Sequence, residues 1–328
     1  MNILSLYDGI SGAMIALRRA GIVVDNYYAS EIDKYAEAVS KYHFPEIKRL
    51  GDVTKIQGKE LPKIDLIIGG FPCQSYSLAG KRLNFDDPRG KLLFEAVRLI
   101  KECQPKYFIL ENVKMKKEIR DAISTLIGVG HIEINSSLLS AQQRKRNYWC
   151  NFFVEQPEDK GILLRDIILS DASEPILHNI YGGFKESKPR TFGDKSPTIR
   201  TSAGGGHIPS LILTNKALQY MDRKVRDGRT HWDFKHHSDV KEDKSNCVVA
   251  NFYKGIPYNV LITEKCIRYF DPIEIERLQT LPDNYTQYGI FDNQVKKISN
   301  TQRYKMIGNG FTVDVISHII KNSQLPFP

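Results

Sequence analysis

Short apolar segments alternate with amphipathic ones along the first 154 residues, and this alternation restricts the possible folds more than any other feature. The run Leu66-Ile67-Ile68 is continuous and apolar, as in strands that a parallel sheet buries on both faces. Between Lys91 and Cys103 the apolar residues recur at helical spacing. The pattern predicts a doubly wound α/β domain. We expect strands at 3–7, 27–29, 65–68, 107–110 and 148–154, and helices at 12–20, 33–42, 91–103 and 116–127.

The segment after the first expected strand, Tyr7-Asp8-Gly9-Ile10-Ser11-Gly12, contains two glycines and leads into a helix. Glycine allows a tight turn and a close approach to a ligand at the carboxyl edge of the sheet, although a plain turn has the same composition. The dinucleotide fingerprint G-x-G-x-x-G is absent. Glu31, after the second strand, can accept hydrogen bonds from both ribose hydroxyls of a nucleoside cofactor. Asp52 can accept one from an adenine amino group, or it can cap a helix.

A cysteine follows the central apolar strand, in Gly69-Gly70-Phe71-Pro72-Cys73-Gln74-Ser75. Most cysteines are small, buried, hydrophobic residues. Two glycines before Cys73 and polar residues after it favour instead a loop at the carboxyl edge of the sheet, where doubly wound folds bind ligands. Because the thiolate is the reactive form of cysteine, we expect cationic groups nearby.

Two further segments bring charged side chains towards the same edge. Glu111 follows the strand expected at 107–110 and is a candidate proton donor, or an ordinary residue at a helix start. Arg144 and Arg146 precede the strand expected at 148–154. Residues two apart in a strand share a face, so both arginines could stabilise an anion or bind base and phosphate oxygens. A basic strand start can equally be solvated.

From about residue 166 the alternation stops, and glycines and prolines separate short stretches. Between 185 and 200 there are five basic and two acidic residues, and the whole chain has a formal charge of +9. Lys and Arg displace counterions from a phosphate backbone, so this charge favours a polyanionic partner, although a solvated face has the same composition. We predict a second, smaller, irregular and mostly β domain with a basic surface.

The five cysteines are scattered and form no C-x-x-C pair. This spacing argues against a disulfide framework and a thiolate zinc site, and it favours a reducing compartment. No metal site is expected. No apolar run approaches the roughly 18 residues needed to cross a bilayer, so no membrane partner is expected.

Eight motifs in order resemble those of the DNA (cytosine-5) methyltransferases, and the resemblance covers essentially the whole chain. The resemblance implies a Rossmann-like methyltransferase sheet with a smaller target recognition domain. It also implies that S-adenosyl-L-methionine is the cofactor and double-stranded DNA the substrate. Some motifs are closest to the animal de novo subgroup. The motifs lie at 7–12, 30–33, 51–52, 71–75, 111–113, 142–146, 268–285 and 308–310.

The resemblance implies roles for particular residues. Cys73 resembles the nucleophile, and Glu111 the residue that binds and protonates the cytosine ring at N3. Arg144 and Arg146 resemble the basic pair that lines the base pocket. In the cofactor site, the resemblance implies contacts from Tyr7, Gly9, Gly12, Glu31 (ribose), Ile32, Asp52 (adenine amino group), Pro72, Leu92 and Asn309.

The same resemblance implies a division of the chain and a set of partners. The catalytic and cofactor-binding domain spans 1–165, the recognition domain 166–285 and a hinge 286–302, and residues 303–328 return to the catalytic domain. Within 268–285, Glu276-Arg277 resembles an element that supports the recognition domain. We expect a monomer on DNA, in the cytoplasm of a bacterial or phage-infected cell, with a restriction endonuclease as a possible partner.

The sequence departs from the family pattern at three places in the cofactor site. Tyr7 stands where the family usually has phenylalanine, and Ser11-Gly12 stands where it has a second glycine pair. Gly310 stands where serine is common, which puts one cofactor contact in doubt. None of these departures affects Cys73 or Glu111.

Three alternative functions share part of this pattern. A tRNA cytosine-5 methyltransferase would have the same catalytic motifs, but the long basic region from about 166 to 267 favours a DNA-reading domain. A catalytically silent DNA-binding protein on the same scaffold would not need both Cys73 and Glu111. A cysteine hydrolase would need a base, and His43 and His131 are expected in connections between helices and strands rather than at strand ends.

We predict that sequence specificity resides between about 166 and 265, with Arg200 and Thr201, beside the 204–206 glycines, as the best candidates for DNA recognition. Exchanging this segment with that of a relative should move the methylated sequence with it, as bisulfite sequencing would show. An Arg200→Ala variant that loses a base contact should lose about 1–3 kcal/mol on its own site and relax at one position. Loss of a phosphate contact would instead weaken binding on all sequences and reduce the salt dependence.

Overall fold

The computed structural model describes residues 1–71, 91–169 and 270–321, with short stretches at 177–179, 190–192, 195–197, 210–211, 261–262 and 267–268. Four residues that the sequence singles out, Pro72, Cys73, Arg200 and Thr201, lie outside the described residues.

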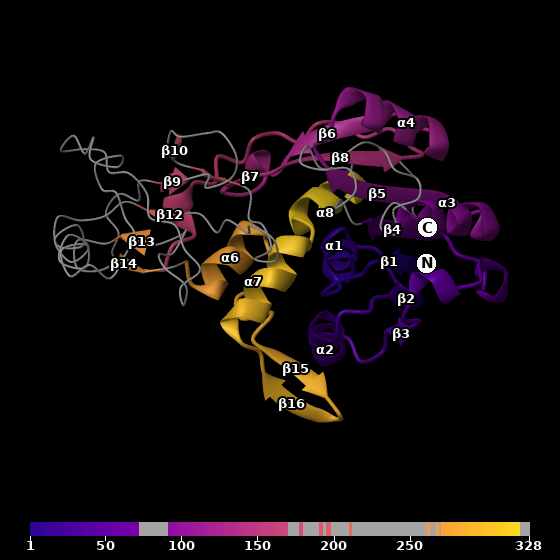
Figure 1. Ribbon diagram of the computed structural model, residues 1–328, viewed down its shortest axis with the longest axis horizontal. Coiled ribbons are helices and arrows are strands. Elements are labelled where there is room, and N and C mark those ends of the chain that lie inside the picture. The colour runs from indigo at the N-terminus through magenta and orange to yellow at the C-terminus, as the bar shows by residue number, and fades with distance from the viewer. Residues whose placement is uncertain are drawn as a thin grey trace, which may run out of the picture.

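Seven strands form the main sheet, in the order β3-β2-β1-β4-β5-β8-β6 (Figure 1). Strands β1 to β5 pair in parallel, and β8 pairs antiparallel with both neighbours. The strand order reverses direction between β1 and β4, which is where doubly wound sheets bind their ligands. The predicted doubly wound fold is therefore confirmed. The strands are β3 (Lys48–Arg49), β2 (Asn26–Ser30), β1 (Asn2–Leu6), β4 (Leu66–Gly70), β5 (Tyr107–Val113), β8 (Lys145–Cys150) and β6 (His131–Asn135).

Several strands differ from the sequence-based expectation, and β3 was not expected. Strand β8 begins at Lys145 and ends at Cys150 instead of spanning 148–154, because its polar first half pairs with β6. Strand β6 itself was not expected, and His131 begins it rather than lying in a connection. Strand β5 continues through Val113, so Glu111 lies inside the strand and not after it.

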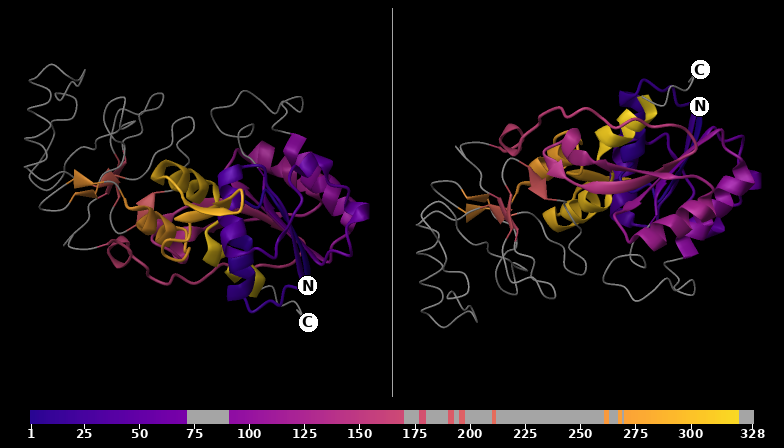
Figure 2. Two further views of the ribbon diagram at one scale, coloured as in Figure 1. Left: turned by 90° about the horizontal axis from the view of Figure 1, so that it is seen from below. Right: turned by 90° about the horizontal axis from the view of Figure 1, so that it is seen from above.

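Helices cover both faces of the sheet (Figure 2). On one face, apolar side chains of α1, α2 and α8 form one core cluster with alternate residues of the strands, among them Ile3 and Ile109. On the other face, α3 and α4 enclose the intervening residues, among them Leu4 and Leu110. This alternation is what a strand buried on both sides requires. The helices are α1 (Gly12–Arg19), α2 (Lys34–His43), α3 (Lys91–Cys103), α4 (Lys117–Ile127) and α8 (Val313–Lys321).

The C-terminal elements lie against the first half of the chain. The helix expected at 312–321 is α8, and its apolar side chains pack with α1 in the same core cluster. Strands β15 (Tyr288–Phe291) and β16 (Gln294–Lys297) form a hairpin within the segment expected to be a hinge. This hairpin packs on α2, where Gly289 approaches Ala38 so closely that a side-chain carbon would meet its backbone at 3.0 Å.

Between β8 and α6 (Pro272–Leu278) in the sequence, the structure describes several short strands, most of which lie farther from the main sheet than α6 (Figure 1). Strand β11 pairs with β7, which ties this region to the segment that leads into β8. Among the described residues, no helix has the length and apolar character required to span a bilayer. The short strands are β7 (Gln142–Gln143), β9 (Leu177–Asn179), β10 (Arg190–Phe192), β11 (Ser196–Pro197), β12 (Ser210–Leu211), β13 (Leu261–Ile262) and β14 (Ile267–Arg268).

A buried ion pair joins α6 to α7 (Asn300–Asn309). The Glu276 carboxylate lies 2.9 Å from the Arg303 guanidinium, and both side chains are almost fully buried. The same carboxylate accepts hydrogen bonds from the backbone N–H and the hydroxyl of Thr286. Arg277, its neighbour in sequence, lies nearer the surface and pairs with Asp283. Glu276 therefore fixes how three C-terminal segments meet.

We predict that Glu276→Ala lowers the free energy of unfolding by about 3–5 kcal/mol, because it leaves the Arg303 guanidinium buried without its counter-charge. Urea denaturation would measure the change. As a control, Glu46→Ala removes the partner of Arg18 in an ion pair whose side chains are more than half exposed, and it should cost less than about 1 kcal/mol. Similar losses in the two variants would contradict the prediction.

Candidate active site

The sheet register brings the ends of four strands to one edge. Leu6, the last residue of β1, lies level with Ser30 on one side and with Gly69 on the other. In β5, Glu111 lies level with Gly70, the last residue of β4. The segments that follow β1, β2 and β4 therefore start side by side at the carboxyl edge, with Glu111 beside them.

Two glycines allow neighbouring groups to approach β4 closely at this edge. A side-chain carbon on Gly69 would lie 2.7 Å from the Leu6 carbonyl oxygen in β1, and one on Gly70 would lie 3.0 Å from a Glu111 oxygen and 3.1 Å from the Phe311 ring. Real side chains do not tolerate contacts of this kind with a backbone oxygen. Gly70 thus leaves room for Glu111 and Phe311 immediately before Phe71-Pro72-Cys73.

The turn after β1 uses the left-handed backbone region three times. Tyr7, Gly9 and Ser11 have φ values of 56°, 59° and 57°. Positive φ is uncommon for residues other than glycine, so the two departures from the family's pattern need support. The Tyr7 hydroxyl donates to the Leu92 carbonyl at the start of α3, a bond that phenylalanine could not make. Tyr7 and Leu92, both expected to contact the cofactor, therefore lie together.

Asp8 is a buried carboxylate at the centre of the same turn. It accepts hydrogen bonds from the hydroxyls of Ser5, Ser11 and Tyr27. Burial raises the pKa of Asp8, although these hydrogen bonds oppose the shift, and burial also raises the pKa of Tyr27. Ser11, which has a positive φ, is thus held by the hydrogen bond from its hydroxyl to Asp8.

Glu31 joins the turn after β1 to the segment after β2. Its two carboxylate oxygens accept hydrogen bonds from the backbone N–H groups of Gly9, Ile32 and Asp33. A carboxylate has about four acceptor positions, so one remains for a ligand hydroxyl. The Ile32 side chain beside it is 78% exposed, which is unusual for an isoleucine and leaves an apolar surface for a flat ring.

Asp52 lies beyond this pair, after β3. The backbone N–H and the hydroxyl of Thr54 both donate to its Oδ1 atom and lower the pKa of Asp52. Oδ2 accepts no hydrogen bond from the described part of the chain. The helix-capping role considered from the sequence is therefore present, and one carboxylate oxygen is still available to a donor such as an amino group.

The other half of the edge holds an ion pair. The Glu111 carboxylate lies 3.0 Å from Nε of Arg146, and each side chain is 12% exposed. Arg146 reaches it from β8, where it pairs with Val113 of β5. Asn112, which follows Glu111 in β5, is buried and donates its side-chain amide to the Phe71 carbonyl. Asn112 thus fixes the last described residue before the cysteine segment.

Arg144 lies on the same side of the sheet but has different partners. Its guanidinium donates to the carbonyls of Gly308 and Gly310, at 3.3 and 3.0 Å, and the residue is 3% exposed. Asn309, between these two glycines, is exposed at the end of α7. The two arginines that the sequence placed on one face therefore meet different groups.

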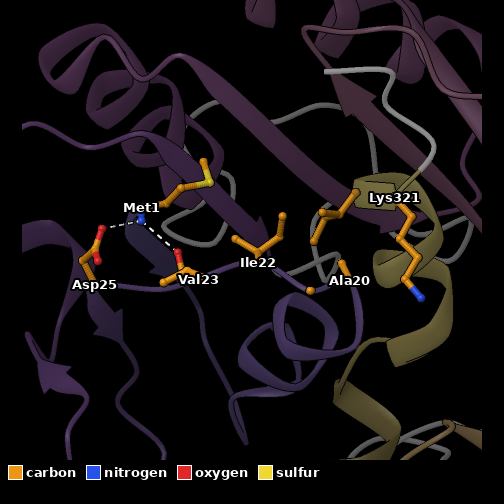
Figure 3. Close-up of a pocket in the computed structure, with 8 residues that line it drawn as sticks. Met1, Ala20, Ile22, Val23, Asp25 and Lys321 are labelled. Carbon is orange, nitrogen blue, oxygen red and sulfur yellow. Dashed lines mark hydrogen bonds and ion pairs between the residues drawn. The ribbon is translucent and has the colours of Figure 1, made fainter. Parts of the chain in front are cut away.

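A cavity of about 440 Å³ lies away from this edge (Figure 3). Its lining comes from the amino ends of β1 and β2 and from the end of α8, and it includes Ile22 and Lys321. The amino group of Met1 donates there to the Val23 carbonyl and to Asp25. The cavity therefore faces the opposite end of the strands from the residues described above.

Sequence reasoning overlooked three residues of this edge. The sequence shows Asp8 only as one residue of a turn, whereas in the structure its carboxylate organises that turn. Tyr285 donates its hydroxyl to the Ile10 carbonyl from the far end of the chain. Asn112 was read only as the neighbour of Glu111. The sole signal for Asp8 was its place in the turn, because its partner Tyr27 comes from another strand.

The fold and this edge define a class of protein: a doubly wound α/β enzyme that holds a nucleoside cofactor beside an acid–arginine pair. Comparison with known proteins specifies the class further. The family described as C-5 cytosine-specific DNA methylase matches residues 1–324. The chain belongs to the C-5 cytosine-specific DNA methylase family.

Relatives and solved structures agree with that family. The chain is 30% identical to the type II methyltransferase M1.ScrFI of Lactococcus lactis subsp. cremoris, over 99% of this chain and 78% of that protein. It is 25% identical to M.HhaI of Haemophilus parahaemolyticus, over 98% and 94%. The Entamoeba histolytica methyltransferase EhMeth has the same fold, with a TM-score of 0.63 and 16% identity over 98% of this chain and 97% of that one.

The protein is therefore a DNA (cytosine-5-)-methyltransferase that uses S-adenosylmethionine as methyl donor. The tRNA methyltransferase alternative is not favoured. The edge residues fit this cofactor: Glu31 retains an acceptor position for a ribose hydroxyl, Ile32 presents an exposed apolar surface, and Asp52 has an available oxygen.

We predict that Asp8→Asn changes how stability depends on pH. Because burial raises the pKa of Asp8 above 3.8, the folded protein keeps a proton that the unfolded chain releases in the window above 3.8. Stability should fall as pH rises through that window, by up to about 1.4 kcal/mol per pH unit. The asparagine variant should lose this slope in urea denaturation between pH 4.5 and 8, whereas the surface variant Asp121→Asn should keep it. Parallel pH profiles for wild type and Asp8→Asn would contradict the prediction.

Proposed function

We propose that the protein methylates carbon 5 of a cytosine flipped out of a specific short sequence in double-stranded DNA, through a covalent adduct with Cys73. The observation that supports this most directly is the pair of Glu111 and Arg146, 3.0 Å apart. The pair lies beside Gly70, three residues before Cys73. An acid and a guanidinium that lie side by side can bind the adjacent N3 and O2 atoms of a cytosine ring.

The chemistry begins with addition to carbon 6 of the ring. Carbon 5 of cytosine is a poor nucleophile while the ring is aromatic. The Cys73 thiolate forms a bond to carbon 6, the electron pair moves towards N3 and carbon 5, and carbon 5 becomes enamine-like. Glu111 holds a proton at N3 and offsets the charge that develops, and Arg146 donates to O2.

S-adenosylmethionine supplies the methyl group as an electrophile. In this proposal the residues of the carboxyl edge, Glu31, Ile32 and Asp52 among them, bind and orient the cofactor beside the activated carbon 5, with Tyr7, Gly9, Gly12, Pro72, Leu92 and Asn309 completing the site. Loss of the proton from carbon 5 then restores the double bond and expels the Cys73 thiolate.

Two other cysteines are unsuited to this role. Cys150 is buried in β8, and burial raises the pKa of its thiol to about 12. Burial also raises the pKa of Cys103 at the end of α3. Neither thiol would form the reactive thiolate near neutral pH. This contrast supports Cys73, which follows the glycines at the edge itself.

The target carbon is inaccessible inside a stacked duplex, so the base has to leave the helix at a cost of a few kcal/mol, which protein contacts offset. The charge of +9 favours such contacts with the phosphate backbone. We also propose that the protein acts as a monomer on DNA in the cytoplasm of a bacterial or phage-infected cell. Relatives from bacteria and a Bacillus phage support this setting, and type II relatives support a restriction endonuclease partner.

We predict that Cys73→Ser abolishes methylation while cofactor affinity stays within about twofold, because only the covalent step is lost. Bisulfite sequencing of DNA from cells that express each form would show methylated cytosines at one short sequence for the wild type alone. A duplex that carries 5-fluorocytosine at that sequence should trap a denaturant-resistant adduct with the wild type, since fluorine cannot leave as a proton.

Near-normal methylation by Cys73→Ser would refute the role of Cys73. Wild-type protein that binds DNA and leaves no methyl mark on any cytosine would refute the proposed reaction. Cys150→Ser serves as the matched control, because it removes a thiol that is buried away from the edge, and it should keep its activity.

A further inference from the structure

We propose that Arg144 is a positioning residue for the cofactor site, which holds the turn at 308–310 in place. The inference rests on the proposed role of Asn309 as a cofactor contact. It assigns different tasks to Arg144 and Arg146, which the sequence pattern treats as one basic pair.

The contacts of Arg144 are at the end of a helix. The last carbonyls of a helix have no partner within it, and α7 ends at Asn309. Arg144 donates to the carbonyls of Gly308 and Gly310, on either side of Asn309. A buried guanidinium thus binds two backbone acceptors at and just beyond the end of the helix.

A glutamine completes the same cap. Gln279, directly after α6, donates its side-chain amide to the carbonyls of Ile307 and Gly310. Its own oxygen accepts hydrogen bonds from Gln142 and from Thr312. All of these side chains are buried. Two side chains from different parts of the chain therefore hold the carbonyl groups of Ile307, Gly308 and Gly310, around the exposed Asn309.

This cap sits where precise backbone placement is needed. Helix ends fray unless their free groups are satisfied, and a turn with a glycine on each side of Asn309 has little stiffness of its own. Asn309 can serve a ligand only if its backbone is held before the ligand arrives. Removing the cap should loosen Asn309 and leave the Glu111–Arg146 pair intact.

Because their contacts differ, we expect different defects when each arginine is replaced. Arg146 ends at the Glu111 carboxylate, and its loss should affect turnover of bound DNA. Loss of Arg144 should affect cofactor binding before any DNA is present. A residue that only stabilised the fold would affect neither selectively.

The test is calorimetric titration of the full-length protein with S-adenosylhomocysteine, without DNA, for Arg144→Met, Arg144→Lys and Arg146→Met. We expect Arg144→Met to raise the cofactor Kd by about tenfold. Arg144→Lys should recover part of the affinity, because an ammonium can reach one carbonyl but not both. Arg146→Met should keep the Kd within twofold while it loses methyl transfer.

A control separates positioning from general stability. Arg303→Met removes another buried arginine from the same helix, one that pairs with Glu276 and not with the turn. It should lower the thermal midpoint and leave the cofactor Kd within twofold. An equal rise of the Kd in Arg303→Met and Arg144→Met would overturn the proposal.

A second route covers the case in which Arg144→Met does not fold. Thr312→Val removes the hydroxyl that orients Gln279 without changing the size of the side chain, and it should raise the Kd for S-adenosylhomocysteine several-fold. Asn309→Ala tests the premise. If Asn309→Ala leaves the Kd unchanged, or if Arg144→Met or Thr312→Val binds as tightly as the wild type, the proposal is wrong. None of these readouts depends on methylation, so a failure here is distinct from a failure of the proposed reaction.

Discussion

The close approach of β4 to its neighbours is the constraint on which the rest of the site depends. A side-chain carbon on Gly69 would lie 2.7 Å from the Leu6 carbonyl oxygen, which is too close, and one on Gly70 would force Glu111 or Phe311 to move. The two strands next to β4 supply the cofactor turn on one side and the acid on the other. A larger residue at either position would separate these two halves. One pair of glycines thus brings the turn after β1 and the Glu111 carboxylate to the same edge of the sheet.

The cofactor turn shows how departures from a family pattern are compensated. A serine in the left-handed region is strained, and at Ser11 the strain is offset by a hydrogen bond to Asp8. Hydrogen bonds from Ser5 and Tyr27 to the same carboxylate offset the cost of burying it. Tyr7 gains a bond to Leu92 that phenylalanine would lack. Each substituted residue therefore has a hydrogen bond of its own, from Ser11 to Asp8 and from Tyr7 to Leu92.

Sequence patterns predicted the parts of the fold that depend on local periodicity. The buried parallel strands and the helices between them follow from apolar spacing alone, and so does the edge at which their ends meet. Apolar spacing does not predict β6 (His131–Asn135), because its sequence is half polar and its extended structure depends on pairing with β8. The Glu276–Arg303 pair and the cap around Asn309 join residues that are 27 and more than 100 positions apart, and no local pattern encodes such contacts.

The positions of Arg144 and Arg146 along the chain explain why two arginines predicted to share a face reach different partners. Arg146 lies within β8, level with Val113 of β5, and its guanidinium extends along the sheet to Glu111 two residues away on that strand. Arg144 precedes β8 by one residue, where α7 and the turn that follows it cover the same face of the sheet. Its guanidinium therefore donates to the backbone carbonyls of Gly308 and Gly310. A shift of two residues along a strand moves a side chain by about 7 Å, which is enough to change its neighbour from the Glu111 carboxylate to the end of a helix.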